Sequence, residues 1–272
     1  GASDELMREA GLYADRLSVN IEIPTREGLK RLAPDKKRED FTKPMEKVKN
    51  EIIQYKAERK IIKSTPKYAP GGQSTQMIIG ASGETDFEIM TASKFFYKKF
   101  QLKRVYYSGY VPVSSDNRLP QIGSEVPLLR ENRLYQTDWL MRFYGFDVHE
   151  ILNPVHLNLD LDIDPKLSWA LRNFDQFPVD VNKANKQMLA RVPGFGMQSV
   201  YKILQARKHR KLTWQHLKNI GVALNRAQYF IICNSTKFER RDLLPSKIKG
   251  LILQNSTRKY NATVSNQLSL FG

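Results

Sequence analysis

The chain has 272 residues and a net charge of +16, and this length can bury a sizeable core in one or two domains. It contains no apolar run long enough to span a membrane and no signal peptide, so we expect a cytoplasmic protein without a membrane partner, with nucleoid association as a further option. Its one cysteine, Cys233, excludes an internal disulfide framework and fits a reducing compartment.

The positive charge is concentrated in the C-terminal part of the chain. From residue 174 onward there are 17 lysine and arginine residues against four acidic residues, whereas residues 1–173 hold 27 basic and 24 acidic residues. A local excess of this size predicts a polyanionic partner such as nucleic acid.

The first half of the sequence alternates strand and helix patterns. Hydrophobic periodicity predicts helices over 4–14, 43–63 and 84–100, and strands over 15–23, 74–80 and 103–113. Strands separated by helices of this length imply parallel βαβ units. Three strands alone leave vulnerable sheet edges, and the chain begins without a methionine. We therefore expect this chain to be part of a longer protein with further strands upstream.

The middle of the chain carries two charged patterns that we interpret as structural. The segment 130–139 has a helical period and contains Arg133 and Asp138, for which a charge pair is one option. Asp160, Asp162 and Asp164 form an acidic ladder. This ladder lacks the glycine turn and the downstream glutamate of a calcium loop, so we expect no metal there.

The segment 181–208 predicts a helix-hairpin-helix. Two short amphipathic helices are separated by a turn that contains one proline and two glycines. The hairpin N–H groups and the N-terminus of the second helix suit a phosphate oxygen. The alternative is a hairpin used only for packing. The residues predicted to contact DNA are Pro193, Gly194, Phe195, Gly196, Gln198, Lys202, Arg207 and Lys208.

The hairpin is followed by more basic sequence and by a second, weaker copy of itself. The run 207–211 is strongly basic, and beside a phosphate-binding hairpin it indicates nucleic-acid contact instead of a solvated face. The segment 213–233 shows a short helix, a turn at Gly221 and another helix from Asn225, without the second glycine. We expect this degenerate copy to pack against the first hairpin and complete a small helical domain.

No other catalytic motif is present in the sequence. The four histidines form no metal-binding spacing, and no nucleophile elbow or phosphate-binding loop occurs. A glycosylase of the helix-hairpin-helix class needs a carboxylate roughly 20 residues after the hairpin, but residues 197–238 contain no aspartate or glutamate. The sequence therefore disfavours a glycosylase.

Several long blocks of the chain, in the same order, resemble one family. They are ADRLSVNIEIPTREGLKRLAP, YAPGGQSTQMIIGASGETD, LKRVYYSGYVPV, LLRENRLYQTDWLMRFYGF, LNLDLDIDPKLSWALR and the hairpin VPGFG. Together, over residues 1–233, they resemble the C-terminal two-thirds of the DNA modification or repair radical SAM proteins. The resemblance implies an α/β fold: the C-terminal half of a partial (β/α) barrel, then a small all-α helix-hairpin-helix domain and a flexible tail.

The family resemblance also implies cofactors. Radical SAM enzymes hold a four-iron four-sulfur cluster on a CxxxCxxC loop and bind S-adenosylmethionine on the cluster. That loop is absent here, so we expect the complete protein to carry both cofactors and this chain alone to assemble neither, because the cluster needs thiolates.

The resemblance places the S-adenosylmethionine site at the ends of the first two strands. It implies cofactor contacts from Ser18, Asn20 and Glu22, which share one side of the first strand, the alternative being a polar outward face. Gly80 matches the adenine-binding strand motif in part, but Gln76 replaces its first glycine and Glu84 comes one place late. The alternative for Gly80 and Glu84 is a turn and a helix-opening acid.

Tyr106, Tyr107 and Tyr110 end the third predicted strand. At a barrel mouth they are expected to stack a base or line the substrate pocket, with a place in the core as the alternative.

The C-terminus carries a separate signal. After a polar linker over 255–266, the chain ends in a peptide that resembles the motif by which bacterial replication and repair proteins bind the sliding clamp. An apolar anchor of this kind fills a hydrophobic pocket; the alternative is a tail folded back on its own domain. The clamp-binding candidates are Gln267, Leu268, Leu270 and Phe271.

The sequence thus predicts four segments: a partial barrel over 1–125, a helical connector over 126–173, the DNA-binding domain over 174–236 and a basic tail over 237–272. Three functions follow. The first is a radical SAM enzyme acting on DNA, the second is a DNA-binding adaptor recruited to the clamp, and the third is an RNA-modifying radical SAM enzyme. The sequence does not name a catalytic residue.

Overall fold

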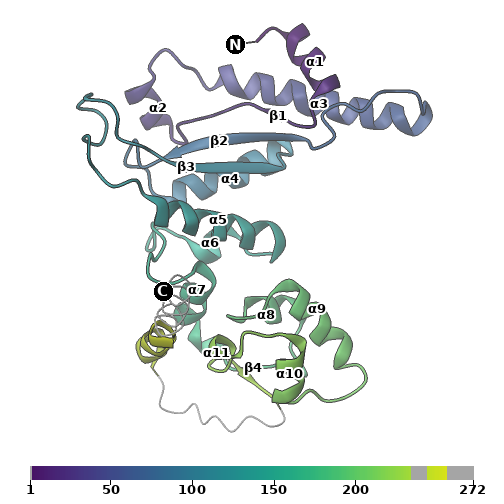
Figure 1. Ribbon diagram of the computed structural model, residues 1–272, viewed down its shortest axis with the longest axis vertical. Coiled ribbons are helices and arrows are strands. Elements are labelled where there is room, and N and C mark those ends of the chain that lie inside the picture. The colour runs from purple at the N-terminus through teal and green to yellow at the C-terminus, as the bar shows by residue number, and fades with distance from the viewer. Residues whose placement is uncertain (1, 234–243, 256–272) are drawn as a thin grey trace, which may run out of the picture. The chain divides into compact units, whose positions relative to one another are not determined.

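The computed structural model describes residues 2–233 and 244–255 (Figure 1). The chain divides into two compact units. We call Gly1–Asp138 with Leu152–Leu159 the sheet unit, and Trp139–Ile151 with the chain from Asp160 onward the hairpin unit. The boundary falls within the segment expected to be a connector, and helix α5 (Leu128–Phe143) contributes to both units.

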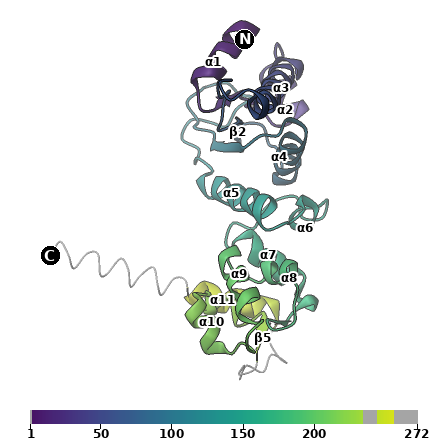
Figure 2. The same ribbon diagram turned by 90° about the vertical axis from the view of Figure 1, so that its right-hand side faces the viewer.

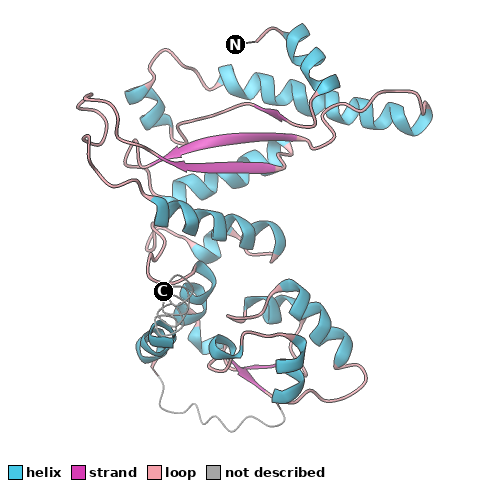
Figure 3. Cartoon of the chain, viewed as in Figure 1, coloured by secondary structure: helices cyan, strands magenta, loops and turns pink. Residues whose placement is uncertain are grey.

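The sheet unit is a mixed α/β structure with a small, all-parallel sheet in the order β1-β2-β3 (Figure 3). The prediction of parallel βαβ units is confirmed, and the described residues form no closed barrel. Besides α5, the elements are α1 (Asp4–Tyr13), β1 (Leu17–Ser18), α2 (Arg26–Leu32), α3 (Glu39–Ile61), β2 (Gln73–Ile79), α4 (Asp86–Phe100) and β3 (Arg104–Gly109).

The central strand β2 forms the core of the sheet unit. Its Met77 and Ile79 are fully buried, and α3 and α4 lie on the same side of it (Figure 2). At its start, the side-chain amide of Gln73 donates to the carbonyl oxygens of Met45 and Phe100. These hydrogen bonds join β2 to the backbones of α3 and α4. Helix α4 begins with a capping box between Thr85 and Glu88, which satisfies backbone donors at its first turn.

The first strand is much shorter than the predicted 15–23. Regular pairing covers two residues, and Glu22 then rejoins β2 through a single bridge to Met77. Glu22 has a φ of +64°, in the left-handed region, which interrupts the two-residue alternation of a strand. The alternating sequence was therefore a correct sign of sheet pairing, and the length drawn from it was wrong.

The outer edge of β3 is covered by side chains. The N–H groups of Val105, Tyr107 and Gly109 donate to the hydroxyls of Tyr97 and Tyr135 and to the carboxylate of Glu131, respectively. These acceptors come from α4 and α5. An edge satisfied in this way has no free donors at those three positions for another strand, which protects it from unwanted pairing.

The hairpin unit consists of short helices and one small sheet. Its elements are α6 (Val148–Ile151), α7 (Pro165–Arg172), a 3-10 turn at Phe174–Gln176, β4 (Val179–Asp180), α8 (Lys186–Arg191), α9 (Met197–Ala206), α10 (Trp214–Ile220), α11 (Leu224–Ala227), β5 (Ile231–Ile232) and a helix over 245–255. Strands β4 and β5 pair in parallel and so join the beginning and end of the two-hairpin segment. The expectation of an all-α domain is corrected by this sheet.

Among the described residues, no helix combines the length and the apolar character needed to cross a membrane.

Candidate nucleic-acid interface

The first hairpin forms where the sequence predicted it. Asn185 is the N-cap of helix α8, and its side chain accepts from the N–H of Met188. Gly194 then turns the chain with a φ of +88°, and the N–H of Phe195 donates to the carbonyl of Val192. Helix α9 follows with Gly196 as its N-cap, and no side chain caps it. The first N–H groups of a helix have no acceptor within the helix, and in α9 no capping side chain supplies one.

Five backbone N–H groups at this turn have no hydrogen-bond acceptor within the described chain. No hydrogen bond within the described part of the chain uses the N–H groups of Gly194, Gly196, Met197, Gln198 and Ser199. The open donors of a helix N-terminus, together with the helix dipole, bind anions. The turn therefore has the chemistry of a phosphate site.

The two glycines of the turn have different roles. A Cβ on Gly194 would lie 2.6 Å from the carbonyl oxygen of Ala223, whereas a Cβ on Gly196 would meet only the Tyr144 hydroxyl, at 3.9 Å. Gly194 is therefore required for packing inside the protein, and Gly196 is the glycine with an open approach. The sequence-based interpretation had assigned both of them to a ligand surface.

The second hairpin packs against the first, as predicted. The αL residue Gly221 ends α10, and the N–H of Ala223 donates to the carbonyl of Gly194. Helix α10 has its own capping box between Thr213 and His216. A backbone hydrogen bond thus joins the two turns directly.

The predicted DNA-contact residues separate into two groups. Pro193 and Phe195 are buried, with Phe195 only 2% exposed, so their side chains face the core. Arg207 donates to the carbonyls of Val181 and Ala184 and so holds the segment before α8. The exposed members are Gln198, Lys202 and Lys208.

Two further residues near α9 were not singled out in the sequence. Lys186 on α8 donates to the hydroxyl of Tyr201 at 2.9 Å and lies 4.6 Å from the centre of its ring. Tyr201 is 51% exposed. Since the pair joins residues 15 apart on two different helices, no periodicity within either helix could have found it.

The acidic ladder binds lysine and arginine side chains. Asp160 and Asp162 pair with Lys249 of the C-terminal helix, while Asp164 caps α7 and pairs with Arg226 of the second hairpin at 2.6 Å. The hydrogen bond to Asp160 raises the pKa of Lys249. Within the described residues no group of acids, histidines and cysteines is arranged to hold a metal.

In the sheet unit, the groups expected at the cofactor have partners within the protein. The Ser18 hydroxyl donates to the Asn20 side chain, and Glu22 pairs with Lys36 at 2.6 Å. Ser18 and Asn20 are exposed. The N–H of Gly80 donates to Glu84 at 2.6 Å. For Ser18, Asn20 and Glu22, this arrangement fits the alternative of a polar outer face.

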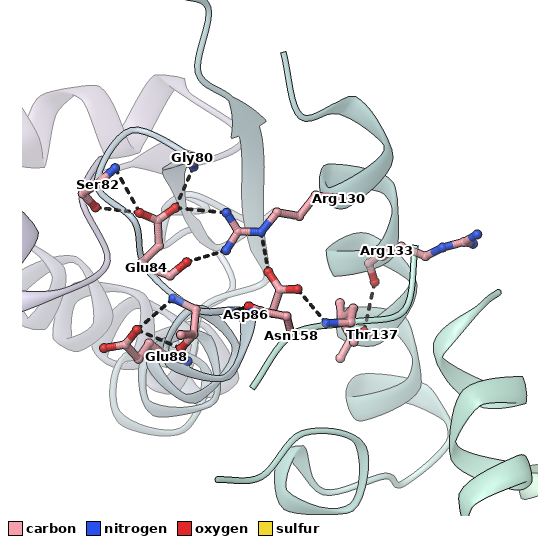
Figure 4. A network of polar contacts seen from close by, with 11 residues as sticks. Gly80, Ser82, Glu84, Asp86, Glu88, Arg130, Arg133, Thr137 and Asn158 are labelled. Atoms are coloured by element: carbon pink, nitrogen blue, oxygen red, sulfur yellow. Dashed lines mark hydrogen bonds and ion pairs between the residues drawn. The ribbon is translucent and has the colours of Figure 1, made fainter. Parts of the chain in front are cut away.

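Glu84 is the centre of a buried polar network (Figure 4). Its carboxylate accepts from the N–H of Gly80 and from both the N–H and the hydroxyl of Ser82. Arg130 of α5 lies 3.6 Å from it and pairs with Asp86 at 2.6 Å. Gly80 is a turn residue, with a φ of +86°. Glu84 does not open α4, because Thr85 is the N-cap.

The three tyrosines do not form one pocket. Tyr107 is fully buried, and its hydroxyl contacts Ser93 at 2.9 Å and Asp138 at 3.3 Å. Burial raises the pKa of Tyr107 well above its usual value. Tyr106 lies on the opposite face of β3, where Arg16 and Arg104 lie over its ring. The hydroxyl of Tyr110 is buried without a hydrogen-bond partner in the described structure.

Asp138, expected to be structural, is 1% exposed and accepts from the Tyr97 hydroxyl at 2.6 Å. The Arg133 guanidinium donates to Gln136, one turn along the same helix. The clamp-binding candidates Gln267, Leu268, Leu270 and Phe271 lie outside the described residues.

Comparisons of the chain with known protein families, curated proteins and solved structures gave no match.

Proposed function

We propose that this protein binds duplex DNA through the sugar-phosphate backbone, without sequence preference, at the first hairpin of the hairpin unit. The observation that carries the proposal is the set of open N–H groups of Gly194 and of Gly196 to Ser199 at an uncapped helix N-terminus. Exposed Lys202 and Lys208 follow on the same segment. Backbone donors and lysines contact phosphates, which position a protein on DNA and carry no base information.

The wider proposal, which rests on the sequence resemblance, is DNA modification or repair by a radical SAM enzyme. The donor set of this chain does not fit the cluster, because the sequence has a single cysteine and the cluster requires several thiolates. We therefore derive no reaction step through the cluster or through S-adenosylmethionine. The proposal for this chain is limited to recognition of the nucleic acid.

The full chain is expected to bind unrelated duplexes with equal affinity and to lose affinity steeply with salt. Replacing Lys202 with methionine removes one phosphate contact, so the slope of log K against log salt should fall by about one. Lys60 is also exposed, but it belongs to α3 of the sheet unit, where the proposal places no DNA contact. The matched Lys60→Met variant should therefore keep both affinity and slope. Fluorescence anisotropy with two unrelated labelled duplexes measures both. Strong preference for one duplex, or equal losses in the two variants, contradicts the proposal.

The same titration separates DNA from RNA. An A-form duplex has its phosphates in a different geometry, so the proposed hairpin contact favours DNA. Tighter binding to duplex RNA supports the RNA-modifying alternative.

The adaptor alternative predicts recruitment to the sliding clamp by the C-terminal peptide. A synthetic peptide of residues 262–272 is expected to bind a bacterial clamp with a Kd on the order of micromolar. Replacing Leu270 and Phe271 with alanine should abolish binding, because a few apolar anchors dominate such small interfaces. Ser269→Ala is the matched control and should bind like the parent peptide. Isothermal titration calorimetry decides, and unchanged binding of the double variant rejects the clamp proposal.

A further inference from the structure

A lysine is buried directly under the DNA-binding turn. Lys166, in the first turn of α7, is only 8% exposed. Its Nζ donates to the carbonyl oxygen of Phe195 at 2.6 Å and lies 4.7 Å from the centre of the Tyr144 ring. A lysine is almost never buried to this degree without a specific partner. Here the partners are a turn carbonyl and an aromatic face.

The hydrogen bond from Lys166 affects the N–H group of Gly196. The carbonyl of Phe195 and the N–H of Gly196 belong to the same peptide group, and this N–H has no acceptor within the described chain. A charge-assisted hydrogen bond to the carbonyl polarises the peptide group and makes its N–H a stronger donor. The ammonium is thus connected through one peptide group to the place proposed for a phosphate oxygen.

The same helix also holds the second hairpin. Asp164, two residues before Lys166, pairs with Arg226 of α11. The start of α7 therefore contacts both hairpins: Lys166 bonds to the first turn, and Asp164 pairs with helix α11 of the second hairpin. Loss of the Lys166 contact affects the first turn and leaves the Asp164 contact in place.

The surroundings of Lys166 set its protonation. The pKa of Lys166 is lowered to about 7, mainly by burial; Asp164 opposes this lowering and Arg191 of α8 adds to it. Arg191 is itself paired with Glu150 of α6 at 2.6 Å. Tyr144 is a further neighbour with a titratable group, and it presents its ring to Lys166.

We propose that Lys166 is a positioning residue for DNA binding: its ammonium polarises the Phe195–Gly196 peptide group, and the chain takes up a proton there when it binds a phosphate. The proposal rests on the proposed function, because it assumes that Gly196 meets the DNA backbone.

The sign of the pH dependence follows from linkage. A nearby phosphate favours the charged form of a lysine, so the pKa of Lys166 is higher in the complex than in the free chain. Affinity for DNA is then greatest at a pH below the pKa of Lys166 in the free chain, about 7. It falls as the pH rises through this value. One proton taken up limits the fall to about tenfold per pH unit.

The test is anisotropy of the full chain with a labelled duplex at fixed salt, from pH 6 to pH 8.5. We compare Lys166→Met with Lys183→Met, whose side chain is 86% exposed in the same unit. The wild-type Kd should rise at least threefold between pH 6.5 and pH 8, and Lys183→Met should show a parallel rise. Lys166→Met should bind more weakly at pH 6 and lose this rise. A Lys166→Met profile parallel to that of the wild type overturns the proposal.

A second measurement needs no DNA and no variant. In the NMR spectrum of the free wild-type chain, the Gly196 amide should titrate with a midpoint near 7 because its peptide group carries the hydrogen bond. An amide that does not move between pH 6 and pH 8.5 overturns the inference, however strongly the chain binds DNA. A Gly196 amide that titrates in a chain without DNA affinity rejects the proposed function and the DNA-linked proton, and leaves only the internal contact.

Discussion

Replacing Arg130 with methionine is expected to destabilise the sheet unit by about 3 to 5 kcal/mol, because removal of one partner leaves buried charges uncompensated. The side chains of Glu84 and Asp86 are 0% and 1% exposed. Arg130 neutralises both and also donates to the backbone carbonyl of Glu84. Hydrogen exchange of the β2 and β3 amides, followed by mass spectrometry, reports the change within this unit.

An exposed ion pair in the same unit is the control. Arg118 pairs with Asp116 at 2.6 Å on a loop, where 47% of the arginine side chain is exposed. Pairs in this setting contribute about 0 to 1 kcal/mol, so Arg118→Met should leave the exchange of β2 and β3 nearly unchanged. Equal protection in Arg130→Met and the wild type would show that the network in Figure 4 does not hold the sheet unit together.

Helices α3, α4 and α9 and the parallel connectivity could be predicted because their signals are local. The helix over 245–255, with Ile248 and Ile252 buried, was not predicted and corrects the expectation of a flexible tail over 237–272. Periodic apolar residues and a Thr85–Glu88 capping box mark α4, and Gly194 and Gly221 mark the two turns with positive φ. Each of these signals is contained within about one turn of chain. For the same reason, the extent of β1 could not be predicted, because the left-handed Glu22 is set by its bridge to Met77 on another strand.

The sequence did not show which of two opposite faces points into the core. Tyr106 and Tyr107 are adjacent, so the two-residue period of a strand sends them to opposite faces of β3, and Tyr107 enters the core. Phe195 lies inside the turn proposed to bind DNA and is nevertheless buried. Lys166 gave no signal at all, since a lysine in the first turn of a helix is ordinarily solvated, and its partner is 29 residues away.

Replacing Gly194 and Gly196 individually with alanine is expected to separate folding from DNA binding. Gly194→Ala places a Cβ 2.6 Å from the Ala223 carbonyl and 3.2 Å from the Ala227 nitrogen, at a φ of +88°. The left-handed conformation costs an alanine about 1 to 2 kcal/mol, and overpacking adds about 1 to 3 kcal/mol. The hairpin unit should therefore lose about 2 to 5 kcal/mol of stability. Urea unfolding followed by tryptophan fluorescence measures it, since all three tryptophans lie in this unit.

Gly196→Ala is the matched control for folding and the more direct test for DNA. Its Cβ enters open space at an ordinary φ of −80°, so stability should change by less than about 1 kcal/mol, the usual range for an N-cap exchange of this kind. The same methyl group stands where a phosphate oxygen would approach the open N–H groups, so affinity for duplex DNA should fall severalfold in a folded chain. If Gly194→Ala unfolds at the same urea concentration as the wild type, the close packing of Gly194 against Ala223 is contradicted. If Gly196→Ala binds DNA like the wild type, the phosphate lies elsewhere than on this peptide group.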